Sequence, residues 1–503
     1  MDCYLGIDLG TSSVRTLALG EDGKVMAVQG RDYAIREPQP GFAEQSMDEW
    51  WEATVDCLRR LLRLEKLRGA QVRSVGLSGQ MHGLALLDRK GNPLRDAIIW
   101  PDRRTAGICR EWARSIGADA ISAIAGLPLA TGFMAPSLSW VKRNEPRLYA
   151  EAGYALLPKD YIRYRLTGKI ATDVTDASGS LLFDVAHRRW SGELAEKFDL
   201  DERLLPPIAE TTELAGEISE SASEATGLRA GTPVAAGGAD IAMAALALGI
   251  GKPGAVAVSI GTGGTVITGI DRLVIDRRMH SFCGAGRDRW ILMGATLSAG
   301  LSLSWFARNV AIPLDAGTVD EDESVIERLL REAEGVPAGS EGLFFAPYIC
   351  GERTPYMDPL AKGCFVGLSL RQGRAHMVRA IMEGVAYSLC DSLDIFKELR
   401  IPIDTILCSG GGSRSPLWRR ILADSFDRPV KWLRGEEHSG IGAAMSGAIA
   451  IGDSVSDANS GDSESETTLP DSGRVAVYRE RREIYKRIHP QLTGIFQDIA
   501  KLD

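Results

Sequence analysis

Features that would indicate nucleic-acid or membrane partners are missing from this sequence of 503 residues. Its 58 Lys and Arg residues against 67 Asp and Glu residues leave a net charge of -9, whereas binding to a phosphate backbone requires clustered positive charge. The longest apolar run, near residues 241–251, is too short to cross a bilayer, and the first residues lack the pattern of a signal peptide. We therefore expect a cytoplasmic protein with neither nucleic-acid nor membrane partners.

Common metal-binding and phosphate-binding motifs are missing as well. The eight cysteines form no CxxC pair and no Cys/His pattern of a metal site, which is typical of a reducing compartment. There is no GxxxxGK[ST], because "GIGKPG" at residues 249–254 has Pro after its Lys, and no GxGxxG opens a helix. A P-loop and a Rossmann dinucleotide site are therefore excluded.

What the sequence does contain is an unusual turn near its start. "GIDLGTSSVR" reads as a strand that ends near Asp8, a turn of small hydroxyl-bearing residues, and a second strand from about Val14. Such a turn offers N–H groups and hydroxyls to an anion, and a carboxylate beside it suggests a cation. The structural alternative is a hairpin with small turn residues, in which Asp8 bonds only to its own backbone.

The same pattern recurs about half a chain later. "SIGTGGTV" at residues 259–266 again gives an apolar strand, a Gly/Thr turn and a strand, and a third glycine turn, "SGGGSRS", follows another apolar strand at residues 409–415. A length of 503 residues exceeds what one core usually serves. We therefore expect two similar domains, at 1–243 and 244–450, followed by a polar loop at 453–468 and a C-terminal helix within 451–503.

Two predicted helices open at aspartates. Residues 48–67 have apolar positions at helical spacing, with Asp48 as a candidate N-cap, and an Ala-rich helix opens at Asp240 after two glycines. Asp240 is equally explained as an N-cap or as a base kept ionised at a helix N-terminus, ready to accept a hydroxyl proton.

Two bends between predicted strands carry polar side chains that could contact a polyol. Gln80 and His82 lie in "GQMHGL", and Trp100 and Asp102 lie in "WPDRR". The structural alternatives are a structural or exposed His, a core Trp and an exposed charge cluster.

Taken in order, these motifs resemble the FGGY family of carbohydrate kinases and, within it, the xylulose kinases. The similarity covers nearly the whole chain and includes "GIDLGTSSVR", "GLSGQMHGLALLD", "LLPKDYIRYRLTG", "DVTDASGSLLFDV", "AAGGAD", "SIGTGG", "YICGERTPYMDPLAKGCFVGL" and "SGGGSRSPLWRRILAD". The resemblance implies an α/β fold of two actin-like ATPase (ribonuclease H-like) domains flanking a central cleft. It also implies ATP and Mg²⁺ as cofactors, with the sugar held mainly by the first domain and ATP by the second.

The resemblance also implies roles for individual residues. It makes Asp240 the catalytic base and Asp8 the metal-associated carboxylate, with both near Mg²⁺. It also makes Met81 and His82 the pair that meets the sugar. With the candidates from the two bends, the predicted sugar-binding positions are Gln80, Met81, His82, Trp100, Asp102 and Asp240. Nucleotide positions are Thr11, Ser12, Ser13, Arg15, Gly261, Thr262, Gly263, Gly300, Gly411, Gly412 and Ser415.

Several residues depart from the pattern of xylulose kinases. Ile241 stands where those enzymes usually have a sugar-binding Asn, and Pro101 replaces the Asn of "WND". Ser137 stands where the family's N-terminal signature has Lys, and the second turn reads "GTGG" where "GTSG" is common. Loss of a hydrogen-bonding partner in a polar pocket can change discrimination between hydroxylated substrates.

We therefore expect ATP-dependent phosphorylation of a ketopentose, D-xylulose to D-xylulose 5-phosphate. One alternative is a kinase for another ketose or polyol, such as ribulose. A second is an actin- or chaperone-like ATPase that acts on a protein partner, which would leave "QMHG" and "GERTP" without a purpose. The sequence leaves a homodimer open.

Overall fold

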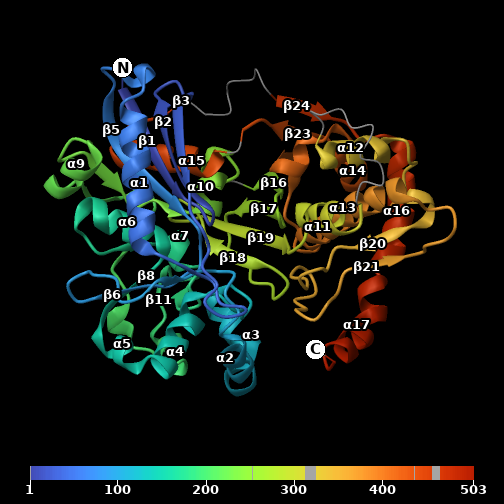
Figure 1. Cartoon of the computed structure of the whole chain (residues 1–503), viewed down its shortest axis with the longest axis horizontal. Coiled ribbons are helices and arrows are strands. Elements are labelled where there is room, and N and C mark those ends of the chain that lie inside the picture. The colour runs from blue at the N-terminus through green and yellow to red at the C-terminus, as the bar shows by residue number, and fades with distance from the viewer. Residues whose placement is uncertain (1, 252, 312–323, 436, 456–464, 503) are drawn as a thin grey trace. The chain divides into compact units, whose positions relative to one another are not determined.

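The computed structural model describes residues 2–251, 253–311, 324–435, 437–455 and 465–502 (Figure 1). The chain divides into two compact units that are not consecutive blocks of sequence. Unit 1 comprises Met1–Lys252, Gly269–Leu292 and Glu437–Asp462, and unit 2 comprises Pro253–Thr268, Met293–Glu436 and Ser463–Asp503. Among the described residues, no helix is long and apolar enough to cross a membrane.

Unit 1 is built on a mixed sheet whose strands lie in the order β13-β14-β5-β1-β2-β3, with β15 also paired to β5. Strand β1 runs antiparallel to β2 and parallel to β5. The strands of this sheet are β1 (Asp2–Leu9), β2 (Ser13–Gly20), β3 (Val25–Asp32), β5 (Gln71–Gly79), β13 (Leu214–Glu217), β14 (Pro233–Ala235) and β15 (Gly238–Ala239).

The helices of unit 1 are α1 (Met47–Leu62), α2 (Ala106–Trp112), α3 (Ala118–Ala125), α4 (Met134–Asn144), α5 (Pro146–Glu151), α6 (Pro158–Thr167), α7 (Val174–Ala177), α8 (Gly192–Lys197), α9 (Glu220–Thr226), α10 (Asp240–Ala247) and α15 (His438–Ala450). Its shorter strands are β4 (Glu44–Gln45), β6 (Ala85–Asp88), β7 (Ala97–Ile98), β8 (Ala152–Leu156), β9 (Thr172–Asp173), β10 (Phe183–Asp184), β11 (Arg189–Trp190), β12 (Ile208–Ala209) and β18 (His280–Cys283).

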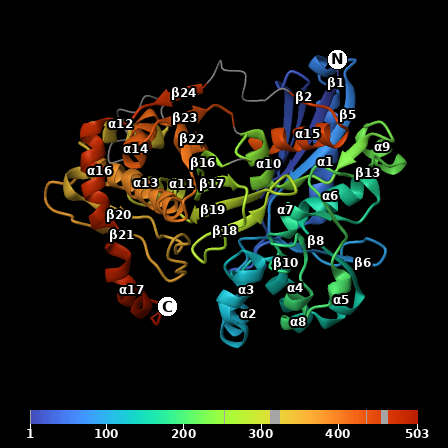
Figure 2. The same cartoon turned by 180° about the vertical axis from the view of Figure 1, so that it is seen from behind.

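Helices cover both faces of the first sheet. The main core cluster packs α1 and α6 on one face, and α15 packs on the other face through Ala444 and Ala448 (Figures 1 and 2). Helix α15 lies so close to the sheet that a Cβ atom on Gly6 would come within 2.0 Å of the Gly440 carbonyl oxygen. Gly6, the first glycine of "GIDLG", is therefore required by the packing of α15 against the strand and not by the geometry of the turn that follows.

Unit 2 repeats this strand arrangement. Strand β16 (Gly254–Ile260) runs antiparallel to β17 (Gly264–Ile270) and parallel to β22 (Ile403–Ser409), in the order β19-β17-β16-β22-β23-β24. The other elements are β19 (Trp290–Thr296), β20 (Phe344–Ala346), β21 (Cys364–Val366), β23 (Val430–Leu433), β24 (Ser465–Thr468), α11 (Gly300–Asn309), α12 (Val325–Glu334), α13 (Arg374–Glu398), α14 (Pro416–Phe426), α16 (Ser472–Tyr485) and α17 (Ile488–Ile499).

The strand–turn–strand readings at both hairpins and the helix opening at Asp240 are confirmed. The N-cap of α1 was wrongly placed, because Ser46 caps this helix by accepting from the Glu49 N–H, and Asp48 lies inside its first turn. In the predicted polar loop at 453–468, residues 465–468 instead form β24, which pairs with β23, and residues 456–464 lie outside the described residues.

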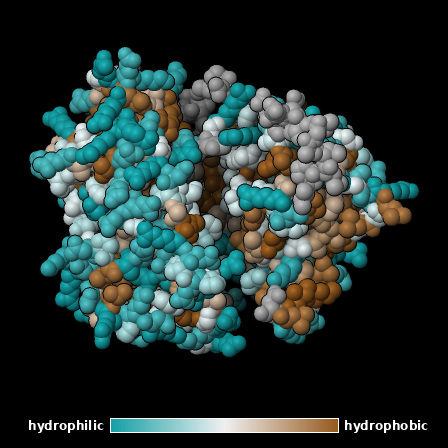
Figure 3. Space-filling model, in the orientation of Figure 1, coloured by the Kyte–Doolittle hydropathy of each residue, from teal (hydrophilic) through white to brown (hydrophobic). Residues whose placement is uncertain are grey.

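The visible surfaces of the two units differ in polarity. On the face drawn in Figure 3, polar side chains dominate unit 1, and apolar side chains gather on the part of unit 2 near its C-terminal helix. Ile495 and Leu502 are among the exposed apolar residues in that helix and its end.

Candidate active site

The carboxyl ends of three parallel strands carry the main polar groups of unit 1. Asp8 lies near the end of β1, Gln80 directly follows β5, and Asp240 directly follows β15. The registers Asp8 with Ser78 and Ala239 with Gly79 bring these ends to one edge of the sheet. This edge is where open α/β sheets usually bind their ligands.

Asp8 is half-buried and incompletely paired, and its Oδ1 atom is buried. Its Oδ1 atom accepts no hydrogen bond from any residue that the structure describes. Burial raises the pKa of Asp8 to about 6, against the opposing effect of the nearby Ser78 hydroxyl and with a further contribution from the negative charge of Glu437. An unsatisfied buried carboxylate oxygen is costly unless a cation or a proton occupies it.

Asp240 is the first residue of α10, whose N-cap is Ala239. The N-cap explanation for this aspartate therefore does not hold, although its Oδ1 accepts the neighbouring Ile241 N–H at 2.7 Å. Burial and the negative charge of Asp8 raise the pKa of Asp240 to about 7. Since each carboxylate disfavours ionisation of the other, a shared cation would stabilise the doubly ionised pair.

Gln80 and the first turn form one hydrogen-bonded unit. The Gln80 Nε2 donates to Gln45 Oε1 at 2.9 Å, and Gln45 Nε2 donates to the Thr11 carbonyl at 2.6 Å. Gly10 N–H donates to the Ser13 carbonyl at 2.9 Å and closes the turn. Through these bonds Gln80 and Gln45 fix the turn, while Ser12 remains exposed.

Arg15, on β2, forms an ion pair with Glu437, the residue before α15. Its guanidinium is therefore tied to unit 1 by a partially exposed pair.

Met81 and His82 are buried in the bend after β5. His82 has a positive φ of 74°, and its Nδ1 lies 2.7 Å from the carbonyl oxygen of Gly179. Because a carbonyl oxygen only accepts, Nδ1 donates in this bond. The ring of Phe133 lies 4.1 Å from that of His82, measured between centroids.

Trp100 and Asp102 differ in their environment. The Trp100 side chain is 40% exposed and its Nε1 donates to Thr11 Oγ1 at 2.9 Å, so it is not a core residue. Asp102 is buried and accepts from the Ala43 N–H at 2.7 Å and from Arg104. Its carboxylate therefore has a structural task, and its role as a sugar ligand stays a prediction.

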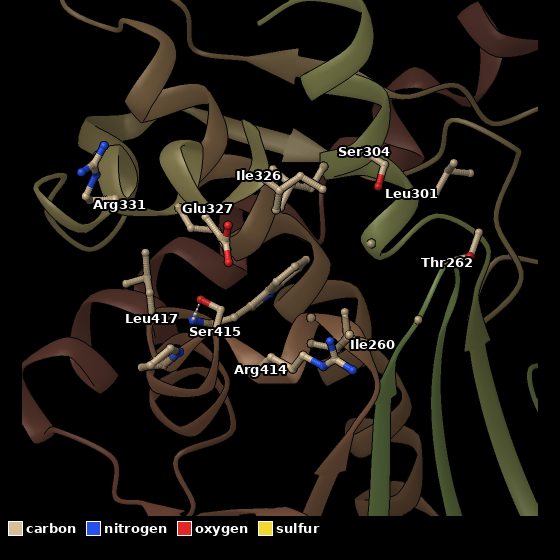
Figure 4. A pocket seen from close by; sticks show the side chains of 18 of the residues that line it. Ile260, Thr262, Leu301, Ser304, Ile326, Glu327, Arg331, Arg414, Ser415 and Leu417 are labelled. Carbon is tan, nitrogen blue, oxygen red and sulfur yellow. Dashed lines mark hydrogen bonds between the residues drawn. The ribbon is translucent and has the colours of Figure 1, made fainter. Parts of the chain in front are cut away.

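Most of the nucleotide positions predicted in unit 2 line one pocket of about 900 Å³ (Figure 4). Its volume is in the range of small-molecule and cofactor sites. The predicted residues among its lining are Gly261, Thr262, Gly300, Gly411, Gly412 and Ser415. Figure 4 shows Thr262 on one side of the pocket and Glu327, Ser415 and Leu417 on the other. Gly263 lies in the same turn as Thr262.

The glycines in and beside this pocket are required for different structural reasons. A Cβ on Gly300 would lie 2.5 Å from the Gly261 carbonyl oxygen, which accepts the Gly300 N–H at 2.9 Å. A Cβ on Gly410, which has φ of 85°, would lie 2.7 Å from the Ile260 carbonyl oxygen. At Gly411, by contrast, no described atom lies within 4 Å of a Cβ position, so the space there belongs to the pocket.

Sequence reasoning missed the residues that support these groups. Gln45 and Glu437 contact predicted site residues directly, and Thr175 accepts the Ala239 N–H at 3.0 Å, next to Asp240. "DVTDASGS" contains Thr175, but the pattern of that segment alone does not indicate which backbone group it would meet.

Comparison with known proteins places the chain among carbohydrate kinases. The model of the FGGY family of carbohydrate kinases, N-terminal domain, matches residues 3–247, and the model of its C-terminal domain matches residues 256–451. Xylulose kinase of Bacillus subtilis (strain 168) is 35% identical over 494 residues, which cover 97% of each chain. L-xylulose/3-keto-L-gulonate kinase of Escherichia coli (strain K12) is 29% identical over 507 residues, which cover 99% of each chain.

A solved structure extends this likeness to the fold. The crystal structure of xylulose kinase from Rhodospirillum rubrum superposes with a TM-score of 0.90 at 28% identity and covers 98% of this chain and 100% of that chain. The prediction of a two-domain α/β sugar-kinase fold is therefore confirmed.

Proposed function

Because the chain belongs to the FGGY family of carbohydrate kinases and is thus an ATP-dependent sugar kinase, we propose that its acceptor is D-xylulose, phosphorylated at the terminal hydroxyl to D-xylulose 5-phosphate. The observation that carries the proposal is the pairing of a half-buried carboxylate of raised pKa, Asp240, with the Gln80–His82 bend at one sheet edge of a chain 35% identical to a xylulose kinase.

Asp240 acts as the general base in this proposal. Its pKa, raised to about 7, suits a group that accepts a proton near neutral pH. The proton of the sugar hydroxyl moves to a carboxylate oxygen of Asp240 as the hydroxyl oxygen forms its bond to the γ-phosphorus, and the bond from this phosphorus to the β–γ bridging oxygen breaks to release ADP. Most of the remaining rate enhancement comes from positioning and from stabilising phosphate charge.

The residues of unit 1 fit a magnesium ion bound with the nucleotide. Asp8 offers a buried oxygen that accepts no hydrogen bond from the described residues, and carboxylate oxygen is a ligand that Mg²⁺ prefers. The described residues contain no group of three or more His, Cys, Asp or Glu side chains placed to hold a metal. Asp8 would hold the ion together with Asp240, which lies close enough for the negative charge of Asp8 to raise the pKa of Asp240. When bound, Mg²⁺ neutralises phosphate charge.

The two turns bind the phosphates in this proposal. Thr11, Ser12, Ser13 and Arg15 present hydroxyl, amide and guanidinium donors from unit 1, and Thr262 presents its hydroxyl from unit 2. The pocket lined by Gly300, Gly411 and Ser415 takes the nucleoside.

A second candidate is a kinase for another ketose or polyol. Ile241 and Pro101 stand where xylulose kinases usually have asparagines, so two side-chain amides are missing from this chain. A relative at 29% identity is named L-xylulose/3-keto-L-gulonate kinase. A pocket that loses a hydrogen-bonding partner changes its preference among hydroxylated substrates.

A coupled assay for ADP over a panel of acceptors tests the proposal. The panel contains D-xylulose, L-xylulose, D-ribulose, L-ribulose, glycerol and a reaction without acceptor. We expect D-xylulose to give the highest kcat/KM, by about tenfold or more over the other ketoses. A higher kcat/KM for another acceptor would overturn the choice of sugar, and equal ATP turnover without acceptor would indicate an ATPase that serves a protein partner.

A further inference from the structure

A buried cluster of charges lies in unit 1, outside the residues to which the proposed function gives a role. Lys159 Nζ lies 2.7 Å from Asp160 Oδ1, 2.8 Å from Asp173 Oδ1 and 3.2 Å from Asp176 Oδ2. Arg163 lies 3.0 Å from Asp160. All five residues are fully buried. Because apolar replacements of buried ion clusters are often no less stable, stability alone is a weak reason for this arrangement.

The cluster holds both ends of the segment that precedes the proposed base. Arg163 Nη1 donates to the Ala236 carbonyl at 2.7 Å. At the other end, the Ala239 N–H donates to Thr175 Oγ1 at 3.0 Å, and the Thr175 hydroxyl donates to Asp173 Oδ2 at 2.5 Å. The Thr175 hydroxyl is therefore fixed as a donor on one side and as an acceptor on the other.

The same segment is pressed against Thr175 by its glycines. Gly237 has φ of 71°, and a Cβ there would lie 2.2 Å from the Leu77 carbonyl oxygen. A Cβ on Gly238 would lie 2.7 Å from Thr175 Oγ1. The backbone before Asp240 thus approaches β5 on one side and Thr175 on the other, which leaves it little freedom to move.

The helix that carries Thr175 also supports the sugar-side bend. Two residues after α7 ends, the Gly179 carbonyl accepts from His82 Nδ1 at 2.7 Å. A Cβ on Gly179 would lie 3.1 Å from His82 Nδ1 and 3.2 Å from Met81 Cε. One short segment therefore contacts both the residue next to Asp240 and the proposed sugar-contacting pair.

We propose that Thr175 is a positioning residue for phosphoryl transfer: its hydroxyl, oriented by Asp173 and Lys159, fixes the Ala239 amide and so the approach of the Asp240 carboxylate to the acceptor hydroxyl. This inference rests on the proposed role of Asp240 as the base. It assigns a task to the "PKDY" and "DVTDAS" segments, which the proposed function leaves without one.

Three variants test the inference. Thr175→Val removes the hydroxyl at nearly unchanged volume, Thr175→Ser keeps it, and Thr226→Val is the matched control. Thr226 is likewise fully buried in unit 1, donates to the Ala222 carbonyl at 2.7 Å and accepts the Leu228 N–H at 3.2 Å.

We expect Thr175→Val to lower kcat by about 100-fold, the effect of displacing a reacting group by about 1 Å. The KM for ATP should stay within about threefold of the wild-type value, because the nucleotide pocket lies in unit 2. Thr175→Ser should retain kcat within about threefold, and so should Thr226→Val despite a similar loss of stability. If Thr175→Val does not fold, Thr175→Ala, which also removes the hydroxyl and is smaller, takes its place with the same expectation.

Hydrogen exchange at the Ala239 amide provides a readout that is independent of catalysis. Thr175→Val should lose protection there, and Thr226→Val should not. A kcat for Thr175→Val equal to that of Thr226→Val, or unchanged exchange at Ala239, would overturn the inference. The absence of acceptor-dependent turnover in the wild-type protein would instead contradict the proposed function, and the exchange measurement would still decide whether Thr175 holds Ala239.

Discussion

The two units use one strand arrangement for different chemistry. In unit 1, β1 pairs antiparallel with β2 and parallel with β5, and in unit 2, β16 pairs in the same way with β17 and β22. When the two turns are aligned on Gly10 and Gly261, Asp8 corresponds to Ser259. The carboxylate at the strand end is thus present in one copy of the motif and absent from the other.

Unit 2 also contains a buried carboxylate, but it is fully satisfied. Glu352 of "GERTP" accepts from Thr296 Oγ1 at 2.6 Å, from the Leu297 and Arg353 N–H groups at 3.2 and 2.7 Å, and from Ser388 Oγ at 3.2 Å. These bonds tie the end of β19 to α13. Burial raises the pKa of Glu352 to about 8, as burial also raises the pKa values of Asp8 and Asp240. The carboxylate of unit 2 therefore differs from those of unit 1 in its four hydrogen-bond donors and not in its pKa.

The largest expected effect comes from a substitution that removes the proposed base of unit 1 and does not alter unit 2. Asp240→Asn removes the proposed base at unchanged size, and we expect kcat to fall by about 1,000-fold, within the range known for general-base catalysis. Steady-state kinetics with saturating sugar and ATP measures this fall, and Asp240→Ala should behave in the same way.

The control for this variant is nucleotide affinity. Because the pocket lies in unit 2 and Asp240 would meet the nucleotide only through Mg²⁺, calorimetric titration of Asp240→Asn with ADP in the absence of Mg²⁺ should give a Kd within about threefold of the wild-type value. Near-normal turnover would contradict the role of Asp240 as base. A loss of ADP binding would contradict the assignment of the nucleotide to unit 2.

An intermediate effect is expected from filling the pocket of unit 2. Gly411 borders open space, so Gly411→Leu should leave the fold intact and occupy volume that the nucleotide needs. We expect the KM for ATP to rise by about tenfold, while the KM for the sugar changes by less than about threefold.

A second glycine provides the control for packing. Gly494 in α17 also has no described atom within 4 Å of a Cβ position, but it does not line the pocket. Gly494→Leu should leave both KM values unchanged. An equal rise in the KM for ATP in both variants would show that the effect is not local to the pocket.

Local features of the sequence predicted the elements that carry the site. The alternation of apolar strand and Gly/Ser/Thr turn located both hairpins, and two glycines before an Ala-rich stretch located the start of α10. These are short-range patterns, in which the backbone preference of each residue decides the local structure.

Contacts between distant segments could not be predicted in this way. Helix α15 packs against Gly6 of β1 although more than 400 residues separate them, as the numbering shows. Asp102 was expected in a sugar site or, alternatively, in an exposed charge cluster. It is buried against Ala43 and Arg104, so the exposed cluster is wrong and the sugar-binding role stays a prediction. Only tertiary packing brings these residues into contact, so the contacts cannot be predicted from periodicity or spacing in the sequence.

The smallest expected effect is a change in Tm, and it should have opposite signs for substitutions at Asp240 in unit 1 and at Glu352 in unit 2. The pKa of Asp240 is raised to about 7 from an unfolded value of 3.8. The folded state therefore binds the proton more tightly, and the free energy of unfolding falls as pH rises from about 4 through 7. Asn does not titrate, so Asp240→Asn should raise Tm relative to the wild-type protein at pH 8, by more than at pH 5.

In unit 2 the matched change should be destabilising. Glu352→Gln leaves one acceptor oxygen for four donors and turns an NH₂ group toward them, which costs about 1–3 kcal/mol for each buried group left unsatisfied. Its Tm should therefore fall relative to the wild-type protein at pH 5, as measured by calorimetry. The fall should be smaller at pH 8, because the pKa of Glu352 is raised to about 8 and the wild-type protein itself loses stability as pH rises. A gain in Tm for Glu352→Gln at pH 5, or a loss for Asp240→Asn at pH 8, would contradict the division between a carboxyl group that stabilises the fold through its hydrogen bonds and one that is kept for catalysis at the expense of stability.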